Sequence, residues 1–254
     1  MLWRKAWLET RWRFVTGLVV LSVLATGNVF QYLAVERLLP GLQFETSRNA
    51  TPFEGFVREA IELQRDFRGF VFFTTFRQNL TQLGIVFAVL LGCGGLLAEA
   101  KKGSVLFTLA LPVTRRRLMN VRIVTGLVQC LAIAMVPPLL IPLFAPAINQ
   151  QFSVVDALAH GLCLFAVGAV FYSLASFLST LFADIWRPLL VAIIVACVAA
   201  VAQVAAPEFG LFRIMSGETY FRTGALPWTG LVTSAVLASA LLYGAAEAIE
   251  RKDF

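Results

Sequence analysis

The chain has 254 residues, of which 59% are hydrophobic and 14% charged, and its formal net charge is +6. This composition is typical of a polytopic membrane protein and excludes an ordinary soluble domain. The Lys and Arg residues flank apolar segments, so we expect membrane lipid, and no nucleic acid, as their partner. The four cysteines fall in four different apolar segments without ligand-like spacing, which favours neither disulfides nor a metal site.

The N-terminal residues predict a helix at the membrane surface followed by a first span. Trp3 and Trp7 recur at helical spacing among basic residues, so residues 1–13 are expected to form an interfacial amphipathic helix on the cytoplasmic leaflet. Residues 14–35 carry no charge, and these 22 residues are long enough to cross the hydrocarbon core. The first span therefore runs from the cytoplasmic side outward.

A polar segment, residues 36–79, is predicted to follow on the outer side. Within it, Thr51-Pro52-Phe53-Glu54 has the features of a helix start: a threonine N-cap, a proline at the first helical position and a glutamate that closes a capping box. Apolar residues recur at helical spacing after this start. We therefore expect an amphipathic helix over 51–70, packed on the outer ends of the spans or on lipid.

Five further apolar segments predict spans at 80–98, 121–145, 154–182, 189–206 and 228–249. Residues 207–227 are too apolar for a water-exposed loop and too rich in glycine for a full span, so we expect a short re-entrant or interfacial segment there. The predicted fold is one all-α polytopic membrane domain over 1–254, with six transmembrane helices. Lys and Arg are enriched on the side that holds both termini, which places the termini in the cytoplasm.

The connection between the second and third spans, residues 99–120, is the longest strongly basic one. The stretch from Glu99 to Arg122 holds six of the 21 Lys and Arg residues against a single acid, Glu99, and the connection is therefore assigned to the cytoplasm. Ser104 can cap a short helix over 105–111, which Pro112 ends. That apolar helix either docks on a partner or lies among lipid headgroups with the arginines on phosphates, and the residues alone leave both alternatives open.

Few residues within the spans suit catalysis. Asp156 and His160 are one helical turn apart and could form a proton pair, although separate structural roles are commoner for such residues. No phosphate-binding loop of the form GxxxxGKS/T is present, so the chain cannot bind ATP by that device. Polar residues that could line a pathway, or pack against other helices, are Tyr172, Ser173, Ser176 and Ser179 in the fourth span, with Asn28, Gln129 and Gln203 in others.

The basic connection resembles that of the permease subunits of ABC-2 type (type V) ABC transporters. Those chains have a glutamate, a Gly-Ser or Gly-Thr pair, an apolar run ending in Leu-Pro, and then a small polar residue and an arginine. The matching residues here are Glu99, Gly103, Ser104, Leu111, Pro112, Thr114 and Arg115. The ending Arg-Lys-Asp-Phe at 251–254 is similar to one common in the family. Where the family has a lysine in the third span this chain has Arg122, which keeps the charge.

The resemblance implies that 105–111 is a coupling helix that docks on a separate ATPase subunit. That subunit would bind the ATP and magnesium, while this chain would carry no cofactor and no catalytic residue. A second permease copy or a paralogue would complete the transporter. The residues implied in ATPase coupling are Glu99, Gly103, Ser104, Val105, Leu106, Phe107, Leu109, Leu111, Pro112 and Arg115.

The expected function is export across the cytoplasmic (inner) membrane of a prokaryote. Small outer segments and an apolar composition favour an amphiphilic or hydrophobic cargo, such as a lipid, a drug or an antimicrobial peptide. Two alternatives stay open. One is a membrane-embedded enzyme acting on lipid or peptide around Asp156 and His160, and the other is a membrane subunit that binds an ATPase without moving cargo.

Overall fold

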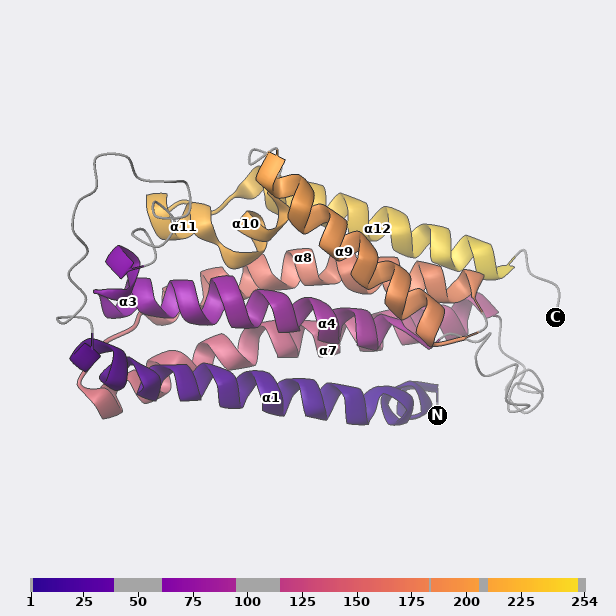
Figure 1. Cartoon of the computed structure of the whole chain (residues 1–254). Coiled ribbons are helices and arrows are strands. Elements are labelled where there is room, and N and C mark those ends of the chain that lie inside the picture. The colour runs from indigo at the N-terminus through magenta and orange to yellow at the C-terminus, as the bar shows by residue number, and fades with distance from the viewer. Residues whose placement is uncertain (1, 39–60, 95–114, 183, 206–209, 251–254) are drawn as a thin grey trace.

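The computed structural model describes residues 2–38, 61–94, 115–182, 184–205 and 210–250, and all the regular structure in these ranges is helical. The predicted all-α class is therefore confirmed for the described part of the chain. Long helices pack side by side in one bundle (Figure 1). Five helical segments within the described ranges are long and apolar enough to cross a membrane. They are α1 (Leu2–Leu38), α7 (Arg115–Phe144) with η3 (Ala145–Ile148), α8 (Val154–Leu181), α9 (Trp186–Ala205) and α12 (Trp228–Glu250).

The helix α1 is continuous over 37 residues, so the interfacial helix predicted over 1–13 is not a separate element. It continues directly into the predicted span 14–35, and at 1.5 Å per residue the whole helix is about 55 Å long. The stretch holds no proline, and its first glycine is Gly17, so no residue type that breaks helices separates the two parts. Ala6 and Thr10 are buried, which shows that the N-terminal part packs on the bundle.

The second predicted span, 80–98, belongs to a helical run that begins at Phe67 and ends at Gly92. The run consists of α3 (Phe67–Phe70), η2 (Val71–Leu80) and α4 (Thr81–Gly92), and the residues at both junctions keep α-helical backbone angles. η2 is a π-helix of ten residues. Residues 67–79, predicted to lie outside the membrane, are thus continuous with the span. Because η2 divides the run, α4 alone has 12 residues, and the layout with six spans stays a prediction.

The amphipathic helix predicted over 51–70 is broken before its end. Residues 51–60 lie outside the described residues, and residues 61–64 are helical. The chain then turns, and Asp66 has extended backbone angles (φ −101°, ψ 141°). Phe67 and Phe70 instead begin the next run, where their ring centroids lie 5.1 and 5.3 Å from that of Tyr32 on α1. This aromatic packing explains why the two phenylalanines leave the predicted helix.

The later helices begin and end close to the predicted spans. α8 begins where the Ser153 side chain accepts a hydrogen bond from the backbone N–H of Val155 (3.2 Å), a regular N-cap. α7 contains three prolines toward its C-terminal end and passes into the 3₁₀ turn η3, which ends at Asn149 with a left-handed φ of 57°. α7 starts at Arg115, earlier than the predicted residue 121, and so includes the last part of the predicted loop 99–120.

The described part of the segment 207–227 forms two short helices in place of one long one. α10 (Leu211–Ser216) and α11 (Glu218–Thr223) are joined at Gly217, and α11 ends at Gly224. Both glycines have positive φ angles, 71° and 73°, which a residue with a side chain rarely adopts. The glycines thus divide the segment, as its composition predicts.

α8 is the central helix of the bundle. It packs against α4, α7, α10 and α12. In its most apolar stretch 67% of the residues are buried, against 22% in the corresponding stretches of α9 and of α12. In Figure 1 it lies behind the purple α3–η2–α4 run. A polar residue on α8 therefore meets other helices, whereas most of α9 and α12 faces the surroundings.

Candidate functional site

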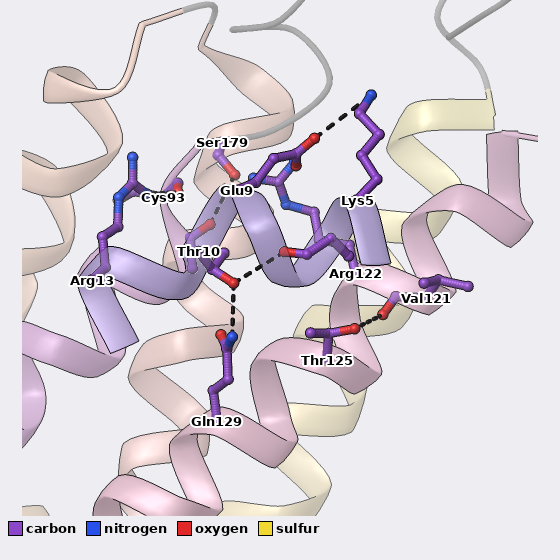
Figure 2. A network of polar contacts seen from close by, with 12 residues as sticks. Lys5, Glu9, Thr10, Arg13, Cys93, Val121, Arg122, Thr125, Gln129 and Ser179 are labelled. Carbon is purple, nitrogen blue, oxygen red and sulfur yellow. Dashed lines mark hydrogen bonds and ion pairs between the residues drawn. The ribbon is translucent and has the colours of Figure 1, made fainter. Parts of the chain in front are cut away.

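One end of the bundle holds a polar network from the N-terminal parts of α1 and α7 and the C-terminal ends of α4 and α8 (Figure 2). We call it the basic end. Here the guanidinium of Arg13 donates hydrogen bonds from Nη1 to the carbonyl oxygens of Leu90 (2.9 Å) and Cys93 (2.6 Å). The last carbonyls of a helix have no partner within that helix, and a cation also suits the negative end of the helix dipole. Arg13 therefore closes the end of α4.

A second helix holds the same end of α4. Ser179 on α8 donates to the carbonyl oxygen of Gly92 at 3.3 Å. A side-chain carbon on Gly92 would lie 2.5 Å from the carbonyl oxygen of Tyr172, so the backbones of α4 and α8 touch here. Side chains from α1 and α8 thus fix α4 just before residues 95–114, the greater part of the basic connection.

Positive charge gathers around Gly94, which has a φ of 99°. A Cβ at this position would lie 3.3 Å from Nη1 of Arg13 and 3.4 Å from Nη2 of Arg122, so both guanidinium groups lie against the same residue. Glu9 pairs with Arg122 (3.5 Å) and with Lys5 (3.6 Å). Three cations, Lys5, Arg13 and Arg122, and one carboxylate thus gather at the basic end, which suits a level where lipid phosphates lie.

Gln129 and Thr10 form a buried polar contact between α7 and α1. Nε2 of Gln129 donates to Oγ1 of Thr10 (2.8 Å), which in turn donates to the carbonyl oxygen of Ala6 (3.1 Å). Oε1 of Gln129 is buried without a hydrogen-bond partner in the described structure. This arrangement favours helix packing, because the polar group that Gln129 binds within the described ranges is on a neighbouring helix.

Three of the predicted pathway residues on α8 share one small cavity at the basic end. Tyr172, Ser176 and Ser179 line it together with Gly92 and Arg122. The hydroxyl of Tyr172 lies 3.3 Å from the carbonyl oxygen of Arg122, where the absence of a side chain on Gly126 makes room for the ring. All three α8 side chains are almost fully buried, so this side of the cavity lies among packed helices.

The other predicted pathway residues lie apart from this cavity. Ser173 donates to the carbonyl oxygen of Ala169 in its own helix (2.6 Å). Asn28 donates to Oγ1 of Thr75 on η2 (3.1 Å), and Gln203 accepts from the backbone N–H of Phe212 on α10 (3.0 Å). The sequence does not predict which way each side chain points, and the structure does not bring the seven residues to one surface. Their role as a pathway stays a prediction.

The coupling residues predicted between Glu99 and Pro112 lie outside the described residues. Arg115 is the first residue of α7. The structure therefore describes where the basic connection leaves and re-enters the bundle, at Gly94 and at Arg115, and leaves the predicted coupling helix itself untested.

Asp156 and His160 do not pair with each other. Asp156 accepts hydrogen bonds from Arg68 and from the hydroxyl of Tyr220, both at 2.9 Å. Nδ1 of His160 lies 2.8 Å from the carbonyl oxygen of Ser216, so this nitrogen carries the proton and donates it. Because each residue has its own structural partner, the geometry favours packing over proton transfer.

Aromatic rings surround His160, and we call this part of the bundle the aromatic end. The His160 ring stacks on Phe76 at 4.2 Å and meets Tyr220 edge-on at 5.7 Å. Burial, followed by the hydrogen bond to Asp156, raises the pKa of Tyr220 above its ordinary value. The hydrogen bond between His160 and Ser216, together with the ring contacts of Tyr220 and Phe221, holds the α10–α11 segment against α8 and η2.

A polar face on the α3–η2–α4 run was not predicted. Thr74, Gln78 and Gln82 recur every fourth residue, Gln78 and Gln82 are exposed, and the half-buried Arg77 lies beside them. The sequence does contain the signal, a polar residue at each helical turn within VFFTTFRQNLTQLGIVF. The charge of Arg77 indicates the outer limit of a span, so the sequence analysis places the start of the second span at residue 80 and leaves most of this polar face outside it.

Comparison with known proteins finds no matching family model, no matching curated protein and no matching solved structure. The function is therefore argued from the sequence pattern and from the geometry of this chain.

Proposed function

We propose that the chain is the transmembrane permease subunit of an ATP-driven exporter of the ABC-2 type. In this proposal the α3–η2–α4 run is the second of six spans, and an amphiphilic or hydrophobic cargo crosses the inner membrane of a prokaryote. A separate subunit binds and hydrolyses ATP with magnesium, and a second permease copy or paralogue completes the transporter. The support is the combination of five apolar helices of spanning length with the Glu99 to Arg115 pattern.

The observation that best supports this proposal is the anchoring of the basic connection at the end of α4. Arg13 of α1 binds the carbonyl oxygens of Leu90 and Cys93, Ser179 of α8 binds that of Gly92, and Arg122 of α7 lies beside Gly94. A force applied to residues 95–114 would be passed directly to four helices. A loop that only lay among lipid headgroups would not need so firm an attachment.

The alternative of a membrane-embedded enzyme finds no supporting observation at Asp156 and His160. The carboxylate is occupied by Arg68 and Tyr220, and the imidazole is held by Ser216 and stacked on Phe76. No group of three or more metal-ligating side chains gathers within the described ranges either. The other alternative, a membrane subunit that binds an ATPase without moving cargo, is distinguished from a permease by the experiment that follows.

The test uses the full chain co-expressed with a candidate ATPase subunit and reconstituted in vesicles. Leu109→Glu and Phe107→Glu place a charge in the apolar run 105–111 and are expected to uncouple ATP hydrolysis from transport, while the protein still inserts. Thr108→Glu, at the polar position of the same run, is the matched control. Coupling that survives both apolar substitutions would refute docking. An ATPase that stays bound and coupled but moves no amphiphile would favour the non-transporting subunit.

A further inference from the structure

The N-terminal part of α1 has two faces of different character. One face packs on the bundle, where Ala6 and Thr10 are buried and Arg13 binds the end of α4. The opposite face, about 200° round the helix, recurs at the same helical spacing two residues away along the chain. Its residues are all exposed, and they are Arg4, Leu8, Arg11 and Val15. This second face is therefore turned away from the rest of the bundle.

Three tryptophans lie on or beside this exposed face. The exposed fractions of Trp3, Trp7 and Trp12 are 54%, 42% and 70%. α1 is free of charge from 14 to 35, so all three rings lie within about three helical turns of the stretch that fits the hydrocarbon core. Tryptophan is enriched at the level of lipid headgroups, because its ring is apolar and its N–H is polar. The position and the residue type of these three side chains both favour that level.

The exposed face continues into the charge-free part of α1 without a break. Val15 and Val19 are exposed there, by 42% and 52%. Along one side of the helix the surface thus changes from valine through tryptophan to arginine, which matches the change from hydrocarbon to headgroup within a lipid leaflet. This continuity favours lipid over a second protein as the occupant of the face.

Arg4 and Arg11 are the charged residues of this face. Within the described ranges neither side chain forms an ion pair or a hydrogen bond. The guanidinium carbon of Arg11 lies 5.4 Å from the centroid of the Trp12 ring, a contact with the flat side of the group that leaves the N–H donors at its edge open. Glu9, the acid of the same stretch, binds two other cations at the basic end. The exposed face thus carries two positive charges without a carboxylate beside them among the described residues.

We propose that Arg4 and Arg11 bind the phosphates of anionic phospholipids, and that the bound lipid steadies the turn of α1 that holds the end of α4. A guanidinium suits a phosphate because its N–H groups donate paired hydrogen bonds and its charge persists in any surroundings. The link to α4 is short, since Arg11 and Arg13 lie on opposite sides of the same helical turn. Arg13 in turn donates to the carbonyl oxygens of Leu90 and Cys93. Such a lipid site would exist whether or not the chain transports a cargo.

The first test measures which lipid lies against Trp12. This ring is kept as the single tryptophan, and the other four tryptophans, all exposed, are replaced by phenylalanine. The full chain is reconstituted in phosphatidylcholine vesicles that contain equal amounts of either brominated phosphatidylglycerol or brominated phosphatidylcholine, because bromine quenches the fluorescence of a ring that it touches. From the quenching, the anionic lipid should bind beside Trp12 at least roughly five-fold more tightly than the zwitterionic one. A variant that keeps only Trp228, at the other end of the bundle, should show no such preference.

Substitutions then identify the residues that give this preference. Arg4→Gln together with Arg11→Gln should make the two lipids quench almost equally, whereas Arg4→Lys with Arg11→Lys should keep most of the preference. Arg37→Gln removes the same charge at the far end of α1 and is the matched control. Equal quenching of Trp12 by the two lipids in the chain with both arginines would overturn the proposal. Quenching by neither lipid would show that a protein surface covers this face, and would overturn it as well.

The second test measures whether the lipid steadies the end of α4. Cys93 is buried at that end, and in a variant whose other three cysteines are replaced by alanine it reacts with an uncharged maleimide when the end opens. Because lipid bound to the closed form opposes opening, phosphatidylglycerol should slow this reaction at least roughly two-fold relative to phosphatidylcholine. A rate that does not depend on the lipid, or a lipid effect that survives Arg4→Gln with Arg11→Gln, would overturn the link to α4. Neither test uses an ATPase or a cargo, so their failure would leave the permease proposal standing.

Discussion

Gln129 and Thr10 form a buried polar pair in which, among the described residues, only Thr10 has a second hydrogen-bond partner. Nε2 of Gln129 depends on Thr10, and Oε1 of Gln129 is buried with no partner in the described structure. Thr10 also donates to the carbonyl oxygen of Ala6 and so keeps a hydrogen bond without Gln129. Removing one partner of a buried pair costs most when the other is left with nothing.

Substitutions at this pair are therefore expected to have unequal effects. Thr10→Val should lower the free energy of unfolding by about 1–3 kcal/mol, because it leaves the whole Gln129 amide without a hydrogen bond. Gln129→Met should change it by less than about 1 kcal/mol, because it removes the unbound acceptor together with the donor. Unfolding of the purified protein in detergent, followed by tryptophan fluorescence, measures both. Equal losses for the two variants would contradict this account.

At the scale of the element, the α10–α11 segment depends on one glycine. Gly217 has a left-handed φ of 71°, and an added Cβ would lie 2.5 Å from Nδ1 of His160. The same nitrogen bonds the carbonyl oxygen of Ser216. Buried Glu218, directly after this turn, binds Arg213 and Arg222 at 3.2 and 3.0 Å. The turn thus sets the position of a histidine and of a buried carboxylate that binds two partly exposed arginines.

Gly217→Ala should destabilise this segment more than Gly224→Ala does. Both positions have nearly the same positive φ, so both substitutions carry backbone strain of about 1–2 kcal/mol. Only Gly217→Ala also displaces His160, since nothing lies within 4 Å of a Cβ at Gly224. Protease cleavage between residues 211 and 223 in the detergent-solubilised protein measures the opening of the segment. Equal cleavage of the two variants would show that the His160 contact does not hold it.

At the scale of the whole molecule, the α3–η2–α4 run decides the topology. If it crosses the membrane with the five apolar helices, both termini lie on one side, and if it does not, they lie on opposite sides. Single cysteines at Ser47, Lys102 and Asp253, in a variant whose four native cysteines are replaced by alanine, test this with an impermeant thiol reagent. We expect Ser47→Cys to react in intact cells, and Lys102→Cys and Asp253→Cys only in inverted vesicles. Reaction of Asp253→Cys from outside would establish an odd number of spans.

The order and type of the long helices could be predicted because each contains a charge-free apolar stretch, and α8 also has a local start signal in its Ser153 N-cap. The start of the second run could not, because Arg77 is read as the limit of a span unless its helical context is known. The partners of Gln129, Asn28 and Gln203 depend on which faces of distant helices meet. Spacing along one helix carries no information on that.

The length of α1 has a mechanical consequence. At about 55 Å the helix exceeds the hydrocarbon thickness of roughly 30 Å by nearly half its length, and no break separates its ends. Its N-terminal part holds the end of α4 through Arg13, and Tyr32, toward its C-terminal end, packs on Phe67 and Phe70. One unbroken helix therefore connects the end of α4 with the aromatic packing at Phe67 and Phe70. A tilt of about 10° around its midpoint would move each tip by roughly 5 Å, so a small rotation at the basic end becomes a displacement at the opposite face of the membrane.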